Sequence, residues 1–216
     1  GIVFGSASQL NVGGSFIAST ADSVLFDNGQ QFSAVVPQSA ALLTVSSPVG
    51  LQYGARSNGD VRANGIDVLG EGHGFIIDPF TLEVLPTRPR AGLRVPAGNT
   101  LALLGGAVTL DGGSLTASEG RVVLLGAGQG DTFALERDPL GWTVQQSDTV
   151  LSDIASSDVS PLADVALLNA SSVFTSGGGG GAVQIEGRRI DLLDGSTLLA
   201  NTYDTEAGRG VVLSAT

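Results

Sequence analysis

The chain has 216 residues and a formal net charge of −11, with 42% hydrophobic and only 14% charged residues. It contains 32 glycines, no cysteine and no methionine, and all of its basic residues are arginine. This composition excludes disulfides and thiolate metal ligands, and the negative charge disfavours nucleic acids and anionic membranes as partners. No apolar stretch reaches the ~18 residues that a membrane helix needs, so we expect no membrane insertion.

Short apolar runs bounded by Gly, Asp, Asn or Ser follow one another along most of the chain. They are rich in Val, Ile and Leu, and each recurs after about six to ten residues, which is typical of strands joined by short turns. Helical periodicity is weak throughout. We therefore predict an all-β protein, with strands within residues 1–5, 9–14, 15–19, 22–26, 41–45, 101–106, 107–112, 114–117, 121–126, 164–169, 172–176, 182–187, 188–193, 196–200 and 210–214.

Part of this pattern repeats. The segment GGAVTLDGGSLTAS, from Gly105, aligns with GRRIDLLDGSTLLAN, from Gly187, and QLNVGGSFIAST near the N-terminus aligns with the second half of both. In this alignment Phe16 corresponds to Leu115. A repeat of roughly 20 to 30 residues indicates a solenoid or a propeller, and propeller blades are longer, at about 40 residues. The repeat therefore predicts a parallel β-helix built from three-strand coils, with glycines at the corners.

Stacked coils would place alternate residues of each strand in a narrow core. The residues predicted to point inward are Val108, Leu110, Leu115, Ala117, Val122, Leu124, Ile190, Leu192, Leu198 and Val212.

Several of these blocks resemble a known family. GIVFGSASQLNVGGSFIASTADSVLF, LLTVSSPVGLQYG and LRVPAGNTLALLGGAVTLDGGSLTASEGRVVL resemble the N-terminal secretion domain of filamentous haemagglutinin-like two-partner secretion exoproteins, and the cyanobacterial type is the most similar. Residues 164–216 resemble the β-helical coils that follow that domain. Gly1 and Ile2 match the end of the family's Asn-Pro-Asn-Gly-Ile secretion motif. We therefore expect the rest of this motif and the N-terminal cap to precede Gly1.

The resemblance implies a right-handed parallel β-helix that is exported through an outer-membrane transporter with POTRA domains. It implies a location outside a Gram-negative-type bacterium, of cyanobacterial type, as a secreted or cell-surface protein. Such proteins serve as adhesins, surface fibres or toxin stalks. The absence of cysteine is compatible with this route, since a chain that crosses a barrel unfolded is better without disulfides.

Two stretches break the coil pattern. We expect a single β-helix domain over residues 1–216, with an excursion as a hairpin or loop at 55–92 and an irregular second excursion at 129–163. The second excursion includes two strand-like segments, TFALE and WTVQQ.

The first excursion contains the candidate acid–base or cation-binding residues. Carboxylates beside a histidine can perform proton transfer or hold a cation. Here, however, Asp and Asn next to Gly are typical of turns, and His73 between two glycines is poorly preorganised. The candidates are Asp60, Asp67, Glu71, His73 and Asp78.

Other candidates are weaker still. The glycine-rich segments at 126–130 and 176–182 precede no helix that could bind phosphate, so we interpret the second as a corner. Trp142 could stack on a sugar, but a buried anchor is the preferred interpretation. Weak calcium binding by aspartates is a further possibility, but no calcium-loop spacing supports it for Asp111, Asp131, Asp191 and Asp194. We therefore expect no catalytic residue, no metal site and no cofactor, and the chain is not predicted to be an enzyme.

Three functional hypotheses remain. The first is the non-catalytic secretion and scaffold region of a large surface adhesin or exoprotein. The second is a subunit of an extracellular fibre, in which copies stack through exposed strand edges. The third is a carbohydrate-active β-helix enzyme, which the 5% aromatic content disfavours. Expected partners are the transporter during export, other copies of the chain, and cell-surface carbohydrate or protein.

Overall fold

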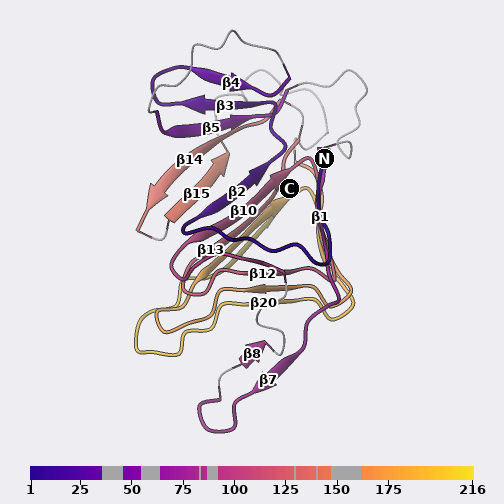
Figure 1. Cartoon of the computed structure of the whole chain (residues 1–216), viewed down its shortest axis with the longest axis vertical. Coiled ribbons are helices and arrows are strands. Elements are labelled where there is room, and N and C mark those ends of the chain that lie inside the picture. Colours follow the sequence, from indigo (N-terminus) through magenta and orange to yellow (C-terminus); the bar gives the residue numbers. More distant parts are fainter. Residues whose placement is uncertain are drawn as a thin grey trace.

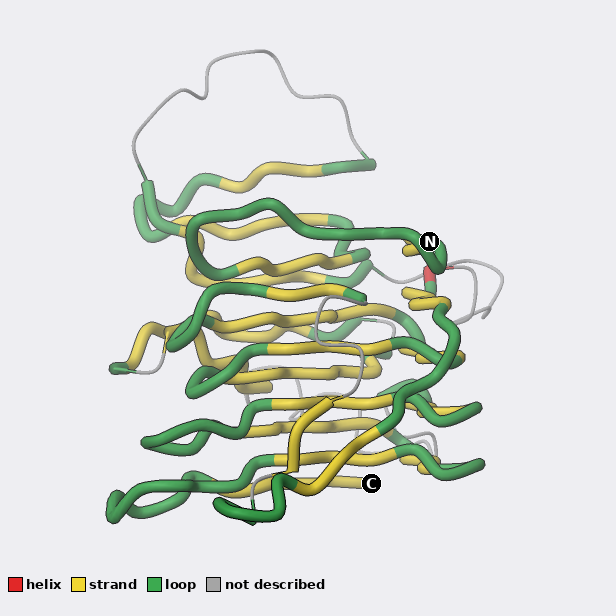
Figure 2. The backbone as a smooth tube through the Cα atoms, turned by 60° about the horizontal axis from the view of Figure 1, so that its bottom comes forward, coloured by secondary structure: helices red, strands yellow, loops and turns green. Residues whose placement is uncertain are grey.

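The structure is a computed structural model that describes residues 1–35, 46–54, 64–82, 84–86, 92–128, 130–139, 141–146 and 162–216. These residues form strands and turns with no α-helix, which confirms the all-β prediction. Most strands lie in three parallel sheets, and Figure 2 shows them as successive layers along the molecule. None of the described residues forms a helix long and apolar enough to cross a membrane.

Each parallel sheet takes one strand from each layer. Sheet A contains, in spatial order, β1 (Ile2–Phe4), β6 (Ile66–Leu69), β11 (Val108–Asp111), β16 (Val165–Leu168) and β19 (Ile190–Leu192). Sheet B contains β2 (Phe16–Ser19), β10 (Thr100–Gly105), β13 (Arg121–Gly126), β18 (Ala182–Gly187) and β21 (Gly210–Ala215). Sheet C contains β9 (Leu93–Arg94), β12 (Ser114–Thr116), β17 (Ser172–Phe174) and β20 (Thr197–Leu199).

The chain visits these sheets in a fixed order. β11, β12 and β13 lie in sheets A, C and B, and the next two sets of three strands repeat that order. We call such a set of three strands a rung. Val108 pairs with Val165 and Val165 with Ile190, so equivalent residues lie directly above one another. Leu115 likewise lies in the column of Leu198, as the sequence alignment predicts.

Two further groups of strands lie outside the rungs. Sheet D is antiparallel and contains β15 (Gly141–Gln146), β14 (Thr132–Asp138), β5 (Pro48–Gln52), β3 (Ser23–Phe26) and β4 (Gln31–Ser33). A separate hairpin of β7 (Phe75–Ile77) and β8 (Val84–Pro86) projects beyond β20 in Figure 1. The predicted strands TFALE and WTVQQ are β14 and β15, while the strand expected at 41–45 lies outside the described residues.

The alignment of the N-terminal segment is wrong. Phe16 pairs with Leu101 in sheet B and not with the sheet C column of Leu115. Residues 10–12, between β1 and β2, form no strand, and Leu10 and Val12 pack on the core. The sequence was misleading because β2 and β12, which lie in different sheets, both follow Gly-Gly-Ser or Gly-Gly and both carry an apolar residue with Ala two positions later.

Two further expectations differ from the structure. The range 55–92 contains β6, which pairs in parallel with both β1 and β11 and so belongs to a rung. Val212 pairs with Gln184, whose side chain points outward, so its neighbours Val211 and Leu213 occupy the inward columns instead. In a strand a shift of one residue moves every side chain to the opposite face.

The core lies between the three parallel sheets. Its buried residues come from alternate positions of the strands, as expected for sheets with one face inward. They are Ala18, Ile66, Val68, Leu93, Val95, Leu101, Leu103, Val108, Leu110, Leu115, Ala117, Val122, Leu124, Val165, Leu167, Val173, Val183 and Ile185. Of the predicted inward residues, Val108, Leu110, Leu115, Ala117, Val122 and Leu124 are members, and Ile190 and Leu198 pack against them half-buried.

Sheet B differs from the other parallel sheets in its burial. Every residue of β10 and β13 is buried, because sheet D covers the outer face of these strands. A strand that is buried on both faces carries a continuous apolar run, as in LALLG and VVLLG. The molecule therefore has two cores on opposite faces of one sheet.

Candidate functional site

Of the acidic candidates around His73, the structure places Asp67 and Asp78 in separate elements. Asp60 lies outside the described residues. Asp67 is part of β6, and Asp78 closes a turn in which its Oδ1 accepts hydrogen bonds from the backbone N–H groups of Phe80 (2.8 Å) and Thr81 (3.1 Å). These hydrogen bonds lower the pKa of Asp78, and the one from Phe80 has the largest effect. Asp78 thus has a structural role in the turn.

His73 connects the segment before β7 to the rung of β19, β20 and β21. Its Nε2 lies 3.1 Å from the carbonyl oxygen of Gly195 and 3.1 Å from Oγ1 of Thr197 in β20, and its ring lies 4.3 Å from that of Phe75. Because a carbonyl only accepts hydrogen bonds, Nε2 carries the hydrogen. The other ring nitrogen, Nδ1, is buried and has no hydrogen-bond partner among the described residues. The contacts of Nε2 make His73 an anchor between the segment before β7 and the turn before β20.

The four aspartates considered for calcium also have separate roles. Asp111 Oδ1 accepts a hydrogen bond from Asn169 Nδ2 at 2.6 Å. Asp191 forms an ion pair with Arg189 at 2.9 Å, and Asp194 adopts a positive φ of 53° in the turn before β20. Among the described residues, no group of three or more acidic or histidine side chains could hold a metal ion.

Asp131 is the buried carboxylate of the second core. Its Oδ2 accepts a hydrogen bond from the backbone N–H of Gly128 (2.8 Å), and its carbonyl accepts one from Tyr53 N–H (2.8 Å). Burial raises the pKa of Asp131 to about 6. Burial also raises the pKa of Tyr53, whose hydroxyl donates to the carbonyl of Leu104 at 2.7 Å and lies 3.0 Å from Ser19 Oγ. These groups join sheet D to sheet B.

Trp142, for which the sequence favours a buried anchor, is half-buried in β15. Its side chain packs against the second core, and the guanidinium of Arg137 lies 5.4 Å from the ring centroid. The core contact and the Arg137 contact both favour an anchoring role over a sugar-stacking one.

Sequence reasoning missed a polar group between sheets B and D. Arg121 is buried, with 8% of its surface exposed, and its guanidinium forms an ion pair with Asp138 of β14 at 2.7 Å. Thr100 and Gln184 lie on the same outer face of sheet B and also contact β15. The available signal was a polar residue at the edge of an otherwise apolar run, which also describes many exposed strand ends.

The glycine-rich segment at 176–182 is a corner, as predicted. It connects β17 to β18, and Gly178 N–H donates to Glu119 Oε1 at 3.0 Å. A side chain at Gly181 would meet the backbone carbonyls of Thr175 and Gly120. The glycines therefore allow adjacent corner loops to stack closely.

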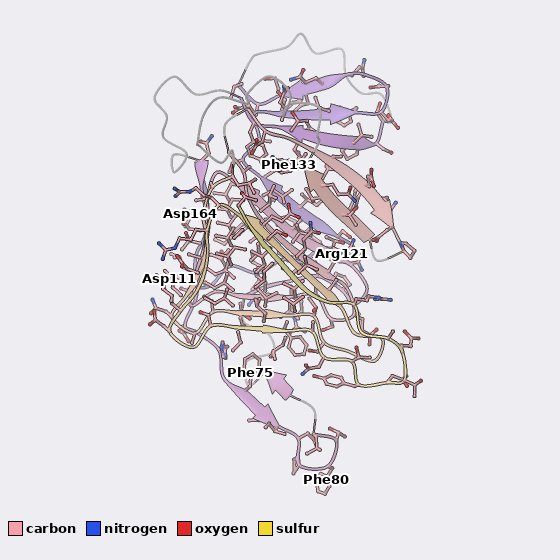
Figure 3. The ribbon with its side chains drawn as sticks, turned by 180° about the vertical axis from the view of Figure 1, so that it is seen from behind. Phe75, Phe80, Asp111, Arg121, Phe133 and Asp164 are labelled. Carbon is pink, nitrogen blue, oxygen red and sulfur yellow. The ribbon has the colours of Figure 1, made fainter. Side chains whose placement is uncertain are left out.

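Among the described residues, the two most exposed large apolar side chains lie in the β7–β8 hairpin. Phe80 at its tip is 93% exposed and Leu82 is 74% exposed, and Figure 3 shows Phe80 far from the parallel sheets. This tip is accessible to a partner.

Gly1 and Ile2, the residues that match the secretion motif, lie at the first strand of sheet A. Ile2 pairs with Ile66 and packs against the main core, and its N–H donates to the carbonyl of Gly65 at 3.0 Å. Their role in secretion stays a prediction.

Comparison with known proteins identifies the family. A family model described as the TPS secretion domain matches residues 1–185, which include every strand from β1 to the middle of β18. No curated protein and no solved structure is significantly similar to the chain. The match extends over most of the sequence and includes both the rungs and sheet D, so the chain belongs to the TPS secretion domain family, the N-terminal domain of two-partner secretion exoproteins.

Proposed function

We propose that this chain is the non-catalytic secretion and scaffold region of a large surface adhesin or exoprotein. As a TPS secretion domain it is a substrate of a two-partner secretion system and interacts with the outer-membrane transporter of that system. The observation that supports a scaffold role is the repeated ladder of three parallel sheets within residues matched by the family. The candidates Asp78, Asp111, Asp191 and His73 each make a separate structural contact, which favours a non-catalytic function.

The rungs are best explained as coils of a right-handed parallel β-helix. Each rung returns to the same three sheets in the same order, with residues in register from one rung to the next. Connections between parallel strands of one sheet are right-handed in about 98% of cases, and β11 to β16 is such a connection. In such a solenoid each rung is stabilised mainly by its neighbours, so the chain can fold progressively as it leaves the transporter.

An export assay tests this function. The full chain, extended before Gly1 by the segment that carries the rest of the secretion motif and the N-terminal cap and by a cleavable signal peptide, is expressed in a Gram-negative host with and without a two-partner transporter. The culture medium is then probed for the protein. We expect extracellular protein only when the transporter is present, with a known substrate of the same transporter as positive control. Retention in the periplasm beside that working control, or release without the transporter, would contradict the proposal.

The POTRA domains of the transporter are the expected contact during export. Added soluble POTRA domains should bind the unfolded chain in a pull-down and compete with its export. Equal binding of an unrelated unfolded protein of similar charge would contradict specific recognition by these domains.

A fibre subunit is a second candidate, favoured by one observation. β19, β20 and β21 form the last rung, and Val211 and Leu213, which occupy inward columns, remain 42% and 49% exposed. Exposed parallel strand edges can pair with further strands of the same chain or of another copy. Light scattering at increasing concentration should then show growth that Val211→Asp abolishes. Growth that is unchanged by this substitution would exclude stacking through this edge.

A further inference from the structure

The outer face of sheet B is covered by strands distant in sequence. Phe133 of β14 pairs with Leu51 of β5, and β5 pairs in turn with β3. Sheet D therefore joins strands that precede β6 in the chain to strands that follow β13. The side chains of sheets B and D form a second core that is separate from the main one (Figure 3). Its buried members are Leu51, Tyr53, Ala102, Leu104, Val123, Leu125, Ala127, Phe133, Leu135, Val144 and Leu162.

The free edge of β15 is capped by side chains of sheet B. Trp142 N–H donates to Thr100 Oγ1 at 2.8 Å, and the Trp142 carbonyl accepts a hydrogen bond from Arg121 Nη1 at 3.0 Å. Two residues further on, the Val144 carbonyl accepts one from Gln184 Nε2 at 3.0 Å. Alternate residues of a strand direct their backbone groups to the same side, so these three side chains occupy the edge that a further strand would otherwise use.

Each capping side chain comes from a different rung. Thr100 begins β10, Arg121 begins β13 directly beside it in register, and Gln184 lies in β18. All three are on the outer face of sheet B, next to the apolar residues of the second core. The capping group therefore exists only after three successive rungs have stacked.

Arg121 is the central member of this group. Its guanidinium donates to both the Trp142 carbonyl and Asp138 Oδ2, so it holds β15 and β14 together. Its burial makes these bonds important, since a buried guanidinium without partners is strongly unfavourable. Sheets A, B and C, in contrast, have their own ladders and their own core without any residue of β14 or β15.

We propose that the β14–β15 hairpin docks onto sheet B as a separate, late folding step, and that Arg121 is the residue that positions it. Stacked rungs form first and present Thr100, Arg121 and Gln184. The hairpin then binds this face, completes sheet D through β5, and closes the second core. Docking of the hairpin therefore requires that at least three rungs have already assembled.

The chain contains its own reporter for this step. Trp142 is the only tryptophan and lies in β15, so its fluorescence follows hairpin docking, while far-ultraviolet circular dichroism follows the strands as a whole. In refolding of the full chain we expect the fluorescence change to lag behind most of the dichroism change. Arg121→Gln should slow the fluorescence phase at least threefold and leave the dichroism phase unchanged. A single common phase in the wild type, or equal slowing of both signals by the variant, would overturn the proposal.

Hydrogen exchange of the native protein provides a second test. Arg121→Gln should raise exchange at least tenfold in residues 132–138, 141–146 and 48–52, with little change in β11 and β12. Arg121→Lys should restore part of the protection, because lysine keeps the charge beside Asp138 but cannot make the two-pronged contact. If Arg121→Gln raised exchange equally in all strands, or left exchange in the hairpin unchanged, the proposed role of Arg121 would be contradicted.

Two variants serve as controls. Arg189→Gln removes an exposed ion pair with Asp191 outside the second core and should change neither measurement. If Arg121→Gln does not fold, Thr100→Val removes one capping contact while keeping a similar volume, and should produce the same selective pattern with a smaller amplitude. Uniform loss of protection in Thr100→Val would also overturn the proposal.

Discussion

At the scale of single residues, buried charge and backbone conformation decide the cost of substitution. Asp131 is 6% exposed, and its carboxylate receives only one hydrogen bond from a described backbone group, that of Gly128. Burial therefore penalises its ionised form. Gly112 is a second sensitive residue, because its φ of 66° lies in the left-handed region and its Cα faces the backbone of Gly70 and Gly72.

The raised pKa of Asp131 makes part of the stability pH-dependent. The ordinary pKa of 3.8 applies to the unfolded chain and about 6 to the folded one, so the folded state holds the proton more tightly. This contribution to the free energy of unfolding is greatest below pH 4, falls as the pH rises to 6, and is constant above it. Compared with Asp131→Asn, the wild type should lose about 1–2 kcal/mol between pH 4 and pH 7 after allowance for solvent screening.

Denaturant titrations of both proteins across this pH range measure that difference. Asp78→Asn is an informative control, because the lowered pKa of Asp78 gives the opposite sign: its contribution is present above the ordinary pKa and is lost as the pH falls. A difference between wild type and Asp131→Asn that does not vary with pH would show that Asp131 is not desolvated.

Gly112 can be compared with Gly98, which has a similar φ of 73° but open space around its Cα. Gly98→Ala should cost about 1 kcal/mol for the left-handed backbone alone. Gly112→Ala should cost more, about 2–4 kcal/mol, because the new Cβ would collide with the backbone of the neighbouring corner. Thermal or chemical unfolding measures both, and equal losses would mean that the corners can move apart.

At the scale of strands, the pairing register determines which side chains are buried and therefore how much each contributes to stability. Sheet B has two buried faces in β10 and β13 and loses this cover toward β21, where all residues are exposed. Apolar residues with the same sequence appearance therefore contribute very differently to stability.

Leu124 and Val212 illustrate this difference. Leu124 is fully buried in the main core, and Val212 is 56% exposed on the outer side of β21. Leu124→Ala should reduce the free energy of unfolding by about 2–5 kcal/mol, and Val212→Ala should change it by less than about 0.5 kcal/mol. Urea titration of the two variants tests the register, and a large loss in Val212→Ala would contradict the outward position of that residue.

At the scale of the whole molecule, folding brings distant segments together, whereas export requires an extended chain. Leu51 pairs with both Val24 and Phe133, so sheet D is complete only when widely separated segments are present together. A chain without cysteine can cross a transporter in an extended form, since no covalent loop forms beforehand.

Because export requires an extended chain, we expect an added disulfide to block it. Ser23 and Gln52 are paired on adjacent strands, so cysteines at both positions can bridge in the oxidising periplasm. We expect the double variant Ser23→Cys with Gln52→Cys to accumulate in the periplasm and to be released when a reductant is added. Either single variant should be exported normally. Efficient export of the oxidised double variant would show that the transporter accepts a covalent loop.

The sequence by itself determined the strand content, the repeated rung and the family, because each depends on local patterns. Apolar alternation places Val108, Leu115 and Leu124 in the core, and glycines mark the corners between strands. The tertiary structure alone decided that β6 joins sheet A, that Phe16 belongs to sheet B, and that Arg121 is buried against a hairpin. These features depend on contacts between segments far apart in the chain, and a pattern confined to one segment carries no information about its distant partner.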